Sequence, residues 1–326
     1  MSRRGWIAFA AISVIWGIPY LFIRIAVRDG MTPPMLAWTR VTLAALILVG
    51  LAWRAGKLDS LRGRWRWLLA YAVAEISIPF PLIAAGERHV SSSLAAIVIS
   101  TVPLIGALLA FRFDHSERPT PTRALGLLIG FSGVIALVGL DVAGRADELL
   151  GTGAIVIAAI GYAIGPMVIK HRLSDLDPRA TMGASLALAS LVLAPVAAVD
   201  RPRTMPGAGA IGAVIVLGVV CTAAAFVIFT VLIREAGTSR ATVITYVNPV
   251  VAVALGVTLL GERPGVGAVA GLLLILAGSW LSTGGKLPPG MVRWAPAWFA
   301  KGAELGADSQ RASRQRGAAQ EPLSAE

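Results

Sequence analysis

Long apolar segments separated by short polar turns make up most of the chain. The segments run for about 20 residues each and lack the polar–apolar alternation of a membrane β-strand. The turns are rich in Gly, Asp and Arg, as in Arg28-Asp29-Gly30. The pattern predicts ten transmembrane helices, at residues 6–27, 34–53, 65–85, 91–112, 121–140, 149–171, 180–199, 208–233, 240–260 and 265–284.

Composition supports an all-α integral membrane protein. The 326 residues are 56% hydrophobic and 14% charged, with a mean hydropathy of +0.75. Soluble proteins are about 25% charged. The protein is therefore expected to have the lipid bilayer as its surroundings.

The net charge of +11 is carried by basic residues in the turns and in the C-terminal tail. This placement favours a role in membrane orientation over nucleic-acid binding, and no nucleic-acid partner is expected. With the N-terminus inside, the inner short segments hold fifteen Lys and Arg residues and the outer ones six. The positive-inside rule then predicts that both termini are cytoplasmic.

The two halves of the chain resemble each other. Glu117-Arg118-Pro119 recurs as Glu262-Arg263-Pro264, and each copy follows an apolar segment with a central proline, Pro103 and Pro249. Because each half has an odd number of helices, the second half must be inverted in the membrane, an arrangement typical of transporters. The predicted organisation is a first repeat at 6–140, a second at 149–284, and a cytoplasmic, largely disordered tail at 285–326.

An ordered set of short motifs is similar to a known family. Ile15-Trp16-Gly17 opens the first helix, Leu36-Ala37-Trp38-Thr39-Arg40 lies in the second, and Thr222-Ala223-Ala224-Ala225-Phe226, Asn248-Pro249-Val250 and Gly261-Glu262-Arg263-Pro264 follow in the second half. Over residues 6–284 the chain resembles EamA transporters of the drug/metabolite transporter superfamily. The resemblance implies ten helices in two inverted EamA repeats around a central cavity.

Two charged residues lie deep inside predicted helices, where charge is unfavourable unless it faces a cavity or a partner. Glu75 is either a proton carrier, a ligand for a cationic group, or part of a structural ion pair or hydrogen bond. Arg40 either binds a substrate carboxylate, pairs with Glu75, or extends toward the membrane surface. Arg24, near a helix end, is expected to extend to the surface.

Other polar and aromatic groups could line a transport cavity or simply pack between helices. Asn248 and Pro249 form a candidate helix break in the middle of the ninth helix, and Pro103 is the equivalent break in the fourth. The candidate cavity-lining or substrate-binding residues are Trp16, Tyr20, Arg40, Tyr71, Glu75, Tyr162, Tyr246 and Asn248.

Signatures of other chemistries are missing from the sequence. The histidines have no partner at metal-ligand spacing, the single Cys221 cannot form an internal disulfide, and no phosphate-binding Gly-Lys-Ser/Thr loop occurs. We expect no cofactor, no metal and no enzymatic activity.

The chain is interpreted as a secondary transporter in the cytoplasmic membrane. It is expected to export a small organic solute, such as an amino acid, metabolite or drug, by alternating access as a monomer or homodimer. An importer or facilitator of the same solutes is the alternative. An intramembrane enzyme and a membrane scaffold are more distant alternatives.

Overall fold

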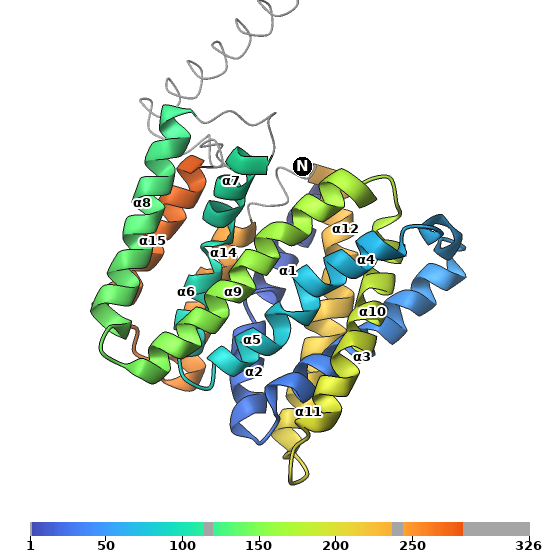
Figure 1. Cartoon of the computed structure of the whole chain (residues 1–326), viewed down its shortest axis with the longest axis horizontal. Coiled ribbons are helices and arrows are strands. Elements are labelled where there is room, and N and C mark those ends of the chain that lie inside the picture. The colour runs from blue at the N-terminus through green and yellow to red at the C-terminus, as the bar shows by residue number, and fades with distance from the viewer. Residues whose placement is uncertain (1, 114–119, 237–243, 283–326) are drawn as a thin grey trace, which may run out of the picture. The chain divides into compact units, whose positions relative to one another are not determined.

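The computed structural model describes residues 2–113, 120–236 and 244–282, and every regular element within them is helical (Figure 1). The described residues all belong to one compact unit, Met1–Gly284. Several predicted features lie outside the described residues, namely the tail at 285–326, the Glu117-Arg118-Pro119 copy of the repeated tripeptide and the start of the helix at 240–260.

The helices are joined by short turns, and several contain a π-helical segment. In chain order they are α1 (Arg3–Ile15), α2 (Pro19–Arg28), α3 (Pro33–Arg54), the short η1 (Leu58–Leu61), α4 (Trp65–Ala72), η2 (Val73–Ser77), α5 (Pro79–Gly86), α6 (Ser92–Ile99), α7 (Val102–Phe113), α8 (Pro121–Leu137), η3 (Val138–Val142), α9 (Ala146–Val168), η4 (Ile169–Leu173), α10 (Pro178–Val199), α11 (Ala208–Ile215), η5 (Val216–Ala224), α12 (Ala225–Ala236), α14 (Ile244–Leu260) and α15 (Val266–Ser282).

Eight helical runs in the described ranges are long and apolar enough to cross a membrane, from Arg3–Arg28 to Ala208–Glu235. The helices α14 and α15 are apolar but shorter, with 17 residues each. At 1.5 Å per residue their described parts extend about 26 Å, and each adjoins residues outside the described ranges. The all-helical architecture expected from the sequence is therefore confirmed, and the count of ten crossings stays a prediction.

Proline interrupts several runs because it cannot donate a backbone hydrogen bond. The chain leaves regular α-helix before Pro19, before Pro79 and before Pro103. At Pro249 the chain stays helical, and this residue lies inside the continuous α14. The proposed break at Asn248 and Pro249 is thus a proline within a helix.

Helices that are distant in sequence pack side by side. The helix α3 packs against α10, α8 against α15, and α6 against α14, while α5 and the preceding η2 pack against α9. Figure 1 shows the α8–α15 pair in green and orange.

Small residues allow the backbones of α8 and α15 to touch. A Cβ atom added at Gly278 would lie 2.3 Å from the backbone nitrogen of Gly130 and 2.5 Å from the carbonyl oxygen of Gly126. A Cβ at Gly133 would lie 2.9 Å from the carbonyl oxygen of Gly271. Such contacts between glycines are typical of helix pairs in membranes.

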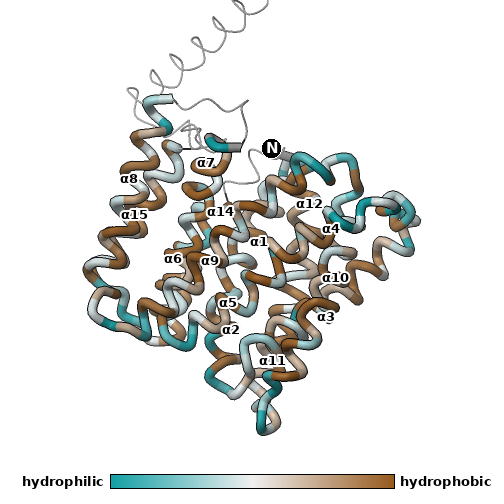
Figure 2. The backbone as a smooth tube through the Cα atoms, in the orientation of Figure 1, coloured by the Kyte–Doolittle hydropathy of each residue, from teal (hydrophilic) through white to brown (hydrophobic). Residues whose placement is uncertain are grey.

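The helices consist of apolar residues along most of their length, and polar residues gather at the turns (Figure 2). Large apolar side chains such as Leu46, Leu191 and Val199 are 71%, 72% and 88% exposed. A soluble protein rarely exposes so much contiguous apolar surface, whereas lipid accommodates it.

Carboxylates cap helices that belong to other parts of the chain. Asp29 accepts a hydrogen bond from the backbone N–H of Ala210 at the start of α11, at 2.8 Å. Asp141 accepts from the N–H groups of Gly267 and Ala268 at the start of α15, at 3.2 and 2.5 Å. Each carboxylate satisfies donors that a helix leaves free at its N-terminus and complements the helix dipole.

Glu262 caps α6 in the same way. Its two oxygens accept the backbone N–H groups of Ser92 and Ser93, at 2.8 and 2.9 Å, and both serine hydroxyls. Partial burial alone raises the pKa of the Glu262 carboxyl, but these hydrogen bonds outweigh burial and lower the pKa below its ordinary value.

Because successive helices alternate in direction, the three capping carboxylates, Asp29, Asp141 and Glu262, all lie at one end of the bundle. This end is here called the carboxylate end.

We expect Gly278→Ala to destabilise the α8–α15 contact, because the added methyl group would overlap backbone atoms of α8. Overpacking of this kind costs about 1–3 kcal/mol. The melting temperature of the purified protein in detergent should fall. Gly139→Ala is the control, since a Cβ there meets nothing within 4 Å. Equal melting temperatures for the two variants would contradict the prediction.

Candidate functional site

Five polar side chains gather among the apolar helices, each from a different element. They are Arg40 of α3, Tyr71 of α4, Glu75 of η2, Tyr162 of α9 and Tyr20 of α2, here called the central cluster. Arg40, Tyr71 and Tyr20 are buried, with exposed fractions of 8%, 4% and 9%. Glu75 is the eleventh residue of the run Trp65–Gly86, about 15 Å from its start at 1.5 Å per residue.

Arg40 is held by a hydroxyl and an aromatic ring. Its Nε donates to the Oγ1 of Thr222 in η5, at 2.9 Å, and its guanidinium carbon lies 4.2 Å from the ring centre of Phe80 in α5. Thr222 in turn donates to the carbonyl of Leu217, at 2.8 Å. The guanidinium therefore has a fixed plane inside the bundle, and the alternative that Arg40 extends to the membrane surface is wrong.

Glu75 lies in a π-helical turn. The N–H of Ile78 donates to the carbonyl of Val73, at 3.1 Å, five residues earlier. Pro79 directly follows and cannot donate to the carbonyl of Glu75, which favours a widened turn at this point. Such turns displace side chains from regular helical positions and are frequent at functional sites.

A glycine on the facing helix makes room for this carboxyl. A Cβ atom added at Gly165 of α9 would lie 2.0 Å from Oε2 of Glu75. Within the described part of the chain, this Oε2 atom is buried and has no hydrogen-bond partner. The carboxyl is therefore positioned by packing and keeps a free acceptor.

The tyrosines connect the two charged groups. The phenol of Tyr162 interacts electrostatically with both Arg40 and Glu75. Tyr71 interacts with Glu75 and Tyr162, and Tyr20 with Tyr162 and Arg40. Among the residues that the structure describes, no salt bridge joins Arg40 to Glu75. One cation and one carboxyl thus share a cluster without neutralising each other directly.

The other predicted cavity residues lie elsewhere. Trp16 packs on Phe226 and Phe229, with ring centres 5.7 and 4.8 Å apart. The hydroxyl of Tyr246 donates to the carbonyl of Ser279, at 3.3 Å, and so joins α14 to α15.

Asn248 also makes a helix–helix contact. With its amide oriented to satisfy its hydrogen bonds, the nitrogen donates to the carbonyls of Ile244 and Ser13, at 2.9 and 3.0 Å. These bonds tie α14 to α1, so in this conformation the Asn248 amide nitrogen is occupied by the protein itself.

Sequence reasoning did not select Thr222, Phe80 or Gly165 as site residues. Thr222 lies in the Thr-Ala-Ala-Ala-Phe motif, which offered a signal. Gly165 follows Gly161 by four residues, a spacing that indicates close helix contact but not a carboxyl partner. Phe80 carried no signal, because its role depends on which helices face each other.

The described residues contain no group of three or more His, Cys, Asp or Glu side chains that could hold a metal ion. Cys221 is buried and has a free thiol. A groove of about 460 Å³ runs between α4–η2 and α9, but its lining includes none of the central-cluster residues. In this conformation the cluster is packed by its own side chains.

A family model, the EamA-like transporter family, matches this chain twice, at residues 3–139 and 149–284. An uncharacterized transporter of Archaeoglobus fulgidus is 28% identical over 286 residues, covering 85% of this chain and 98% of its own. The uncharacterized inner membrane transporter YedA of Escherichia coli K12 is 31% identical over 261 residues, covering 78% and 82%.

A probable terminal-alkyne amino-acid exporter of Streptantibioticus cattleyicolor is 28% identical, covering 86% of this chain and 93% of its own. A solved crystal structure with 20% identity matches at a TM-score of 0.61, over 86% of this chain and 98% of that one, and supports the fold. With apolar helices of spanning length and two matches to the same family model, the chain is a multi-pass membrane protein that belongs to the EamA-like transporter family, within the drug/metabolite transporter superfamily.

Proposed function

We propose that this protein is a secondary transporter that exports a small organic solute across the cytoplasmic membrane by alternating access. The central cluster is the proposed substrate site. The observation that carries the proposal is the burial of Arg40 and Glu75 in one cluster without a salt bridge between them. Charge at membrane depth is unfavourable, so a protein that keeps two such groups separate uses them for a ligand or an ion.

The chemistry of the cluster favours a solute that carries both charges. The planar fork of Arg40 suits a carboxylate, and Glu75 suits an ammonium group. The phenols of Tyr71 and Tyr162 offer apolar faces with hydrogen-bonding ends. An amino acid has this combination of groups, and the name of the Streptantibioticus relative, an amino-acid exporter, agrees with it.

The packing of the helices supports two inverted five-helix repeats. If residues 149–284 repeat 6–140, then α3 and α10 are equivalent second helices, and α8 and α15 are equivalent fifth helices. In the structure α3 packs against α10 and α8 packs against α15, as expected for equivalent helices around a pseudo-two-fold axis. Rocking of one half against the other would expose the central cluster to the two sides in turn.

The direction of transport and the membrane orientation are part of the same proposal. The proposed orientation has cytoplasmic termini and the carboxylate end outside, and the excess of Lys and Arg on one side supports it. An importer would use the same site with the opposite gradient. An intramembrane enzyme is disfavoured, because the family and the names of its members indicate transport.

The proposal is tested by reconstituting the full chain in liposomes and measuring counterflow of the twenty proteinogenic L-amino acids. An accepted amino acid is then compared with its analogues that lack the carboxylate or the amine. We expect both analogues to be rejected. Transport of either analogue at the rate of its parent would remove the corresponding charged residue from the substrate site.

Arg40→Lys is expected to weaken binding of an accepted amino acid about tenfold or more, because Lys keeps the charge but loses the planar fork. The contacts with Thr222 and Phe80 are lost with it. Binding is measured by isothermal titration calorimetry in detergent. Arg62→Lys is the matched control, since the Arg62 side chain is 86% exposed. Unchanged affinity in the Arg40 variant would contradict the assignment.

Glu75→Gln is expected to reduce strongly the response of transport to an imposed proton gradient, because the amide cannot bind or release a proton at physiological pH. Counterflow without a gradient should persist at a reduced rate. The measurement is uptake into proteoliposomes with and without an acidic lumen. A variant that still responds to the gradient like the parent protein would exclude Glu75 as the proton carrier.

Gly165→Ala is expected to reduce transport by displacing the Glu75 carboxyl, whose Oε2 occupies the space of the new methyl group. Gly153→Ala, on the same helix, is the control because a Cβ there meets nothing within 4 Å. Initial transport rates are compared at matched amounts of folded protein. Equal rates for both variants would mean that the position of Glu75 does not matter.

A further inference from the structure

A second buried carboxyl lies near the carboxylate end, outside the central cluster. Glu87 directly follows α5, and its exposed fraction is 0%. Both of its carboxyl oxygens are buried and lack a hydrogen-bond partner within the described ranges. An ionised carboxylate without partners is strongly unfavourable in such surroundings, whereas a protonated one is tolerated.

The nearby cation is engaged elsewhere. Arg24 of α2 donates through Nη1 to the backbone carbonyl of Glu87 and, at 3.1 Å, to that of Val90. Its buried Nε has no partner among the residues that the structure describes. Arg24, which is expected to extend to the membrane surface, is half-buried and joins α2 to the turn between α5 and α6 at the carboxylate end.

Other charged groups surround this carboxyl from two elements. Arg24 and, through its phenol, Tyr20 face it from α2, and Glu262 faces it from the turn between α14 and α15. Burial raises the pKa of the Glu87 carboxyl well above its ordinary value; Arg24 opposes this increase, and the negative charge of Glu262 adds to it.

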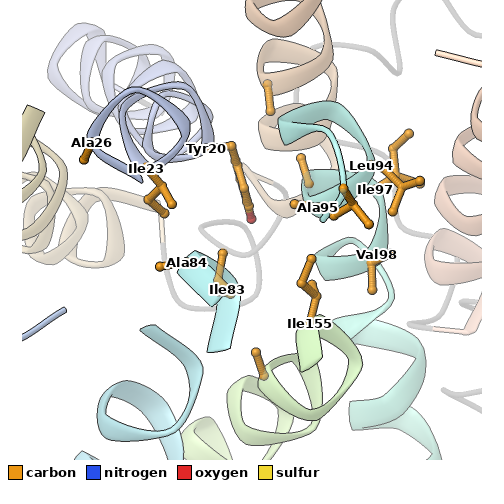
Figure 3. Close-up of a cluster of buried hydrophobic side chains, with 14 of the residues drawn as sticks. Tyr20, Ile23, Ala26, Ile83, Ala84, Leu94, Ala95, Ile97, Val98 and Ile155 are labelled. Atoms are coloured by element: carbon orange, nitrogen blue, oxygen red, sulfur yellow. The ribbon is translucent and has the colours of Figure 1, made fainter. Parts of the chain in front are cut away.

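Tyr20 lies between this carboxyl and the central cluster. It interacts electrostatically with Glu87 as well as with Tyr162 and Arg40. In Figure 3 its ring projects from α2 toward the segments that carry Ile83 and Ala95. Residues on α2 thus contact both polar regions.

The carboxylate end has a polar pocket close to this region, although neither Glu87 nor Arg24 lines it. This pocket, of about 300 Å³, lies beside the turn between α5 and α6, and Val90 forms part of its wall. The charged groups and the histidine that line it are His89, Asp141, Arg145, Glu148 and Arg263.

We propose that Glu87 is a proton-binding site of the transport cycle, distinct from Glu75, and that Arg24 responds to its protonation by holding or releasing the turn between α5 and α6. The proposal rests on the alternating access proposed above. With Glu87 protonated, Arg24 bonds the carbonyls of Glu87 and Val90 and keeps the carboxylate end closed.

When water at this end accepts the proton, a carboxylate forms next to Arg24 and near Glu262. A carboxylate is a stronger partner for a guanidinium than a carbonyl is, so Arg24 leaves the Val90 carbonyl. Repulsion from Glu262 favours solvation of the new charge. Arg24 then stays paired with Glu87, but the part of the turn around Val90 is released from α2, and this release together with the solvation of Glu87 opens this end of the bundle.

The direction of the pH effect follows from proton linkage. The Glu87 carboxyl binds its proton more tightly in the closed form, where its pKa is raised, than in an open form where water solvates it. Proton binding to Glu87 therefore stabilises the closed form fully at a pH below the pKa of this carboxyl in the open form, which is near the ordinary value of about 4.3. This stabilisation is lost as the pH rises through the raised pKa of the same carboxyl in the closed form.

The test measures the opening directly, in the full chain in lipid nanodiscs. Nitroxide labels are placed at Met205→Cys and Val266→Cys in a Cys221→Ala background, because these two neutral side chains are 89% and 79% exposed. Met205 precedes Gly207, which bonds to Asp29 at the end of α2, and Val266 follows the Glu262 turn. Distances are recorded by double electron–electron resonance from about pH 5 to about pH 9, a range above the ordinary glutamate pKa.

We expect the longer-distance population to grow from a minority to a majority as the pH rises. Glu87→Gln, which mimics the protonated form, should keep the short distance at every pH. Arg24→Gln, which removes the bonds to the turn, should give the long distance even at low pH. Asp147→Asn, an exposed carboxylate at the same end, should titrate like the parent. A pH-independent parent, or a Glu87→Gln variant that titrates like it, would overturn the proposal.

Transport assays separate this proposal from the proposed function. If the labels respond to pH through Glu87 but no amino acid is transported, the assignment of substrate fails and the proton site stands. If amino acids are transported and Glu87→Gln retains the full pH dependence of transport, the proton site fails and the transporter stands. Arg40→Ala should abolish substrate binding and leave the pH response of the labels intact.

Discussion

Hydrogen-bond satisfaction in apolar surroundings is the constraint on which the whole structure depends. Backbone groups that face lipid have no water to bond, so the chain forms helices and meets their free N-termini with acceptors from elsewhere. Asp29, Asp141 and Glu262 do this for α11, α15 and α6. The caps join distant turns at one end of the bundle, and therefore help to determine which helices are neighbours.

Among the described residues, the charged groups with buried atoms that break this rule lie in the regions assigned to function. Most buried polar groups have partners, but carboxyl oxygens of Glu75 and Glu87 have none among the described residues. Each carboxyl lies near an arginine that bonds a neutral acceptor, Thr222 for Arg40 and backbone carbonyls for Arg24. A fold made only for stability would pair these charges or replace them with apolar side chains. Keeping them apart leaves each carboxyl free to bind a proton or a cationic group.

The two acidic sites suit different steps of one cycle. The central cluster lies at membrane depth and combines a fixed guanidinium, a carboxyl and phenols, and it is the proposed recognition site for a charged solute. Glu87 lies where a helical run ends, close to a polar pocket lined by His89 and Val90, and Arg24 joins α2 to the same turn. Tyr20 interacts with both regions, so α2 links binding at the centre to packing at the carboxylate end.

The sequence by itself determined the helical membrane architecture, because runs of about 20 apolar residues have few alternatives in lipid. It also singled out Arg40 and Glu75, since charge inside such a run is conspicuous. Only the tertiary structure decided that three tyrosines surround them while Trp16, Tyr246 and Asn248 make helix–helix contacts. The same holds for Glu87, which looks like an ordinary turn residue next to Arg88 and His89. Its burial depends on α2 and the Glu262 turn, which lie far away in the chain and close in space, and local sequence patterns do not encode that proximity.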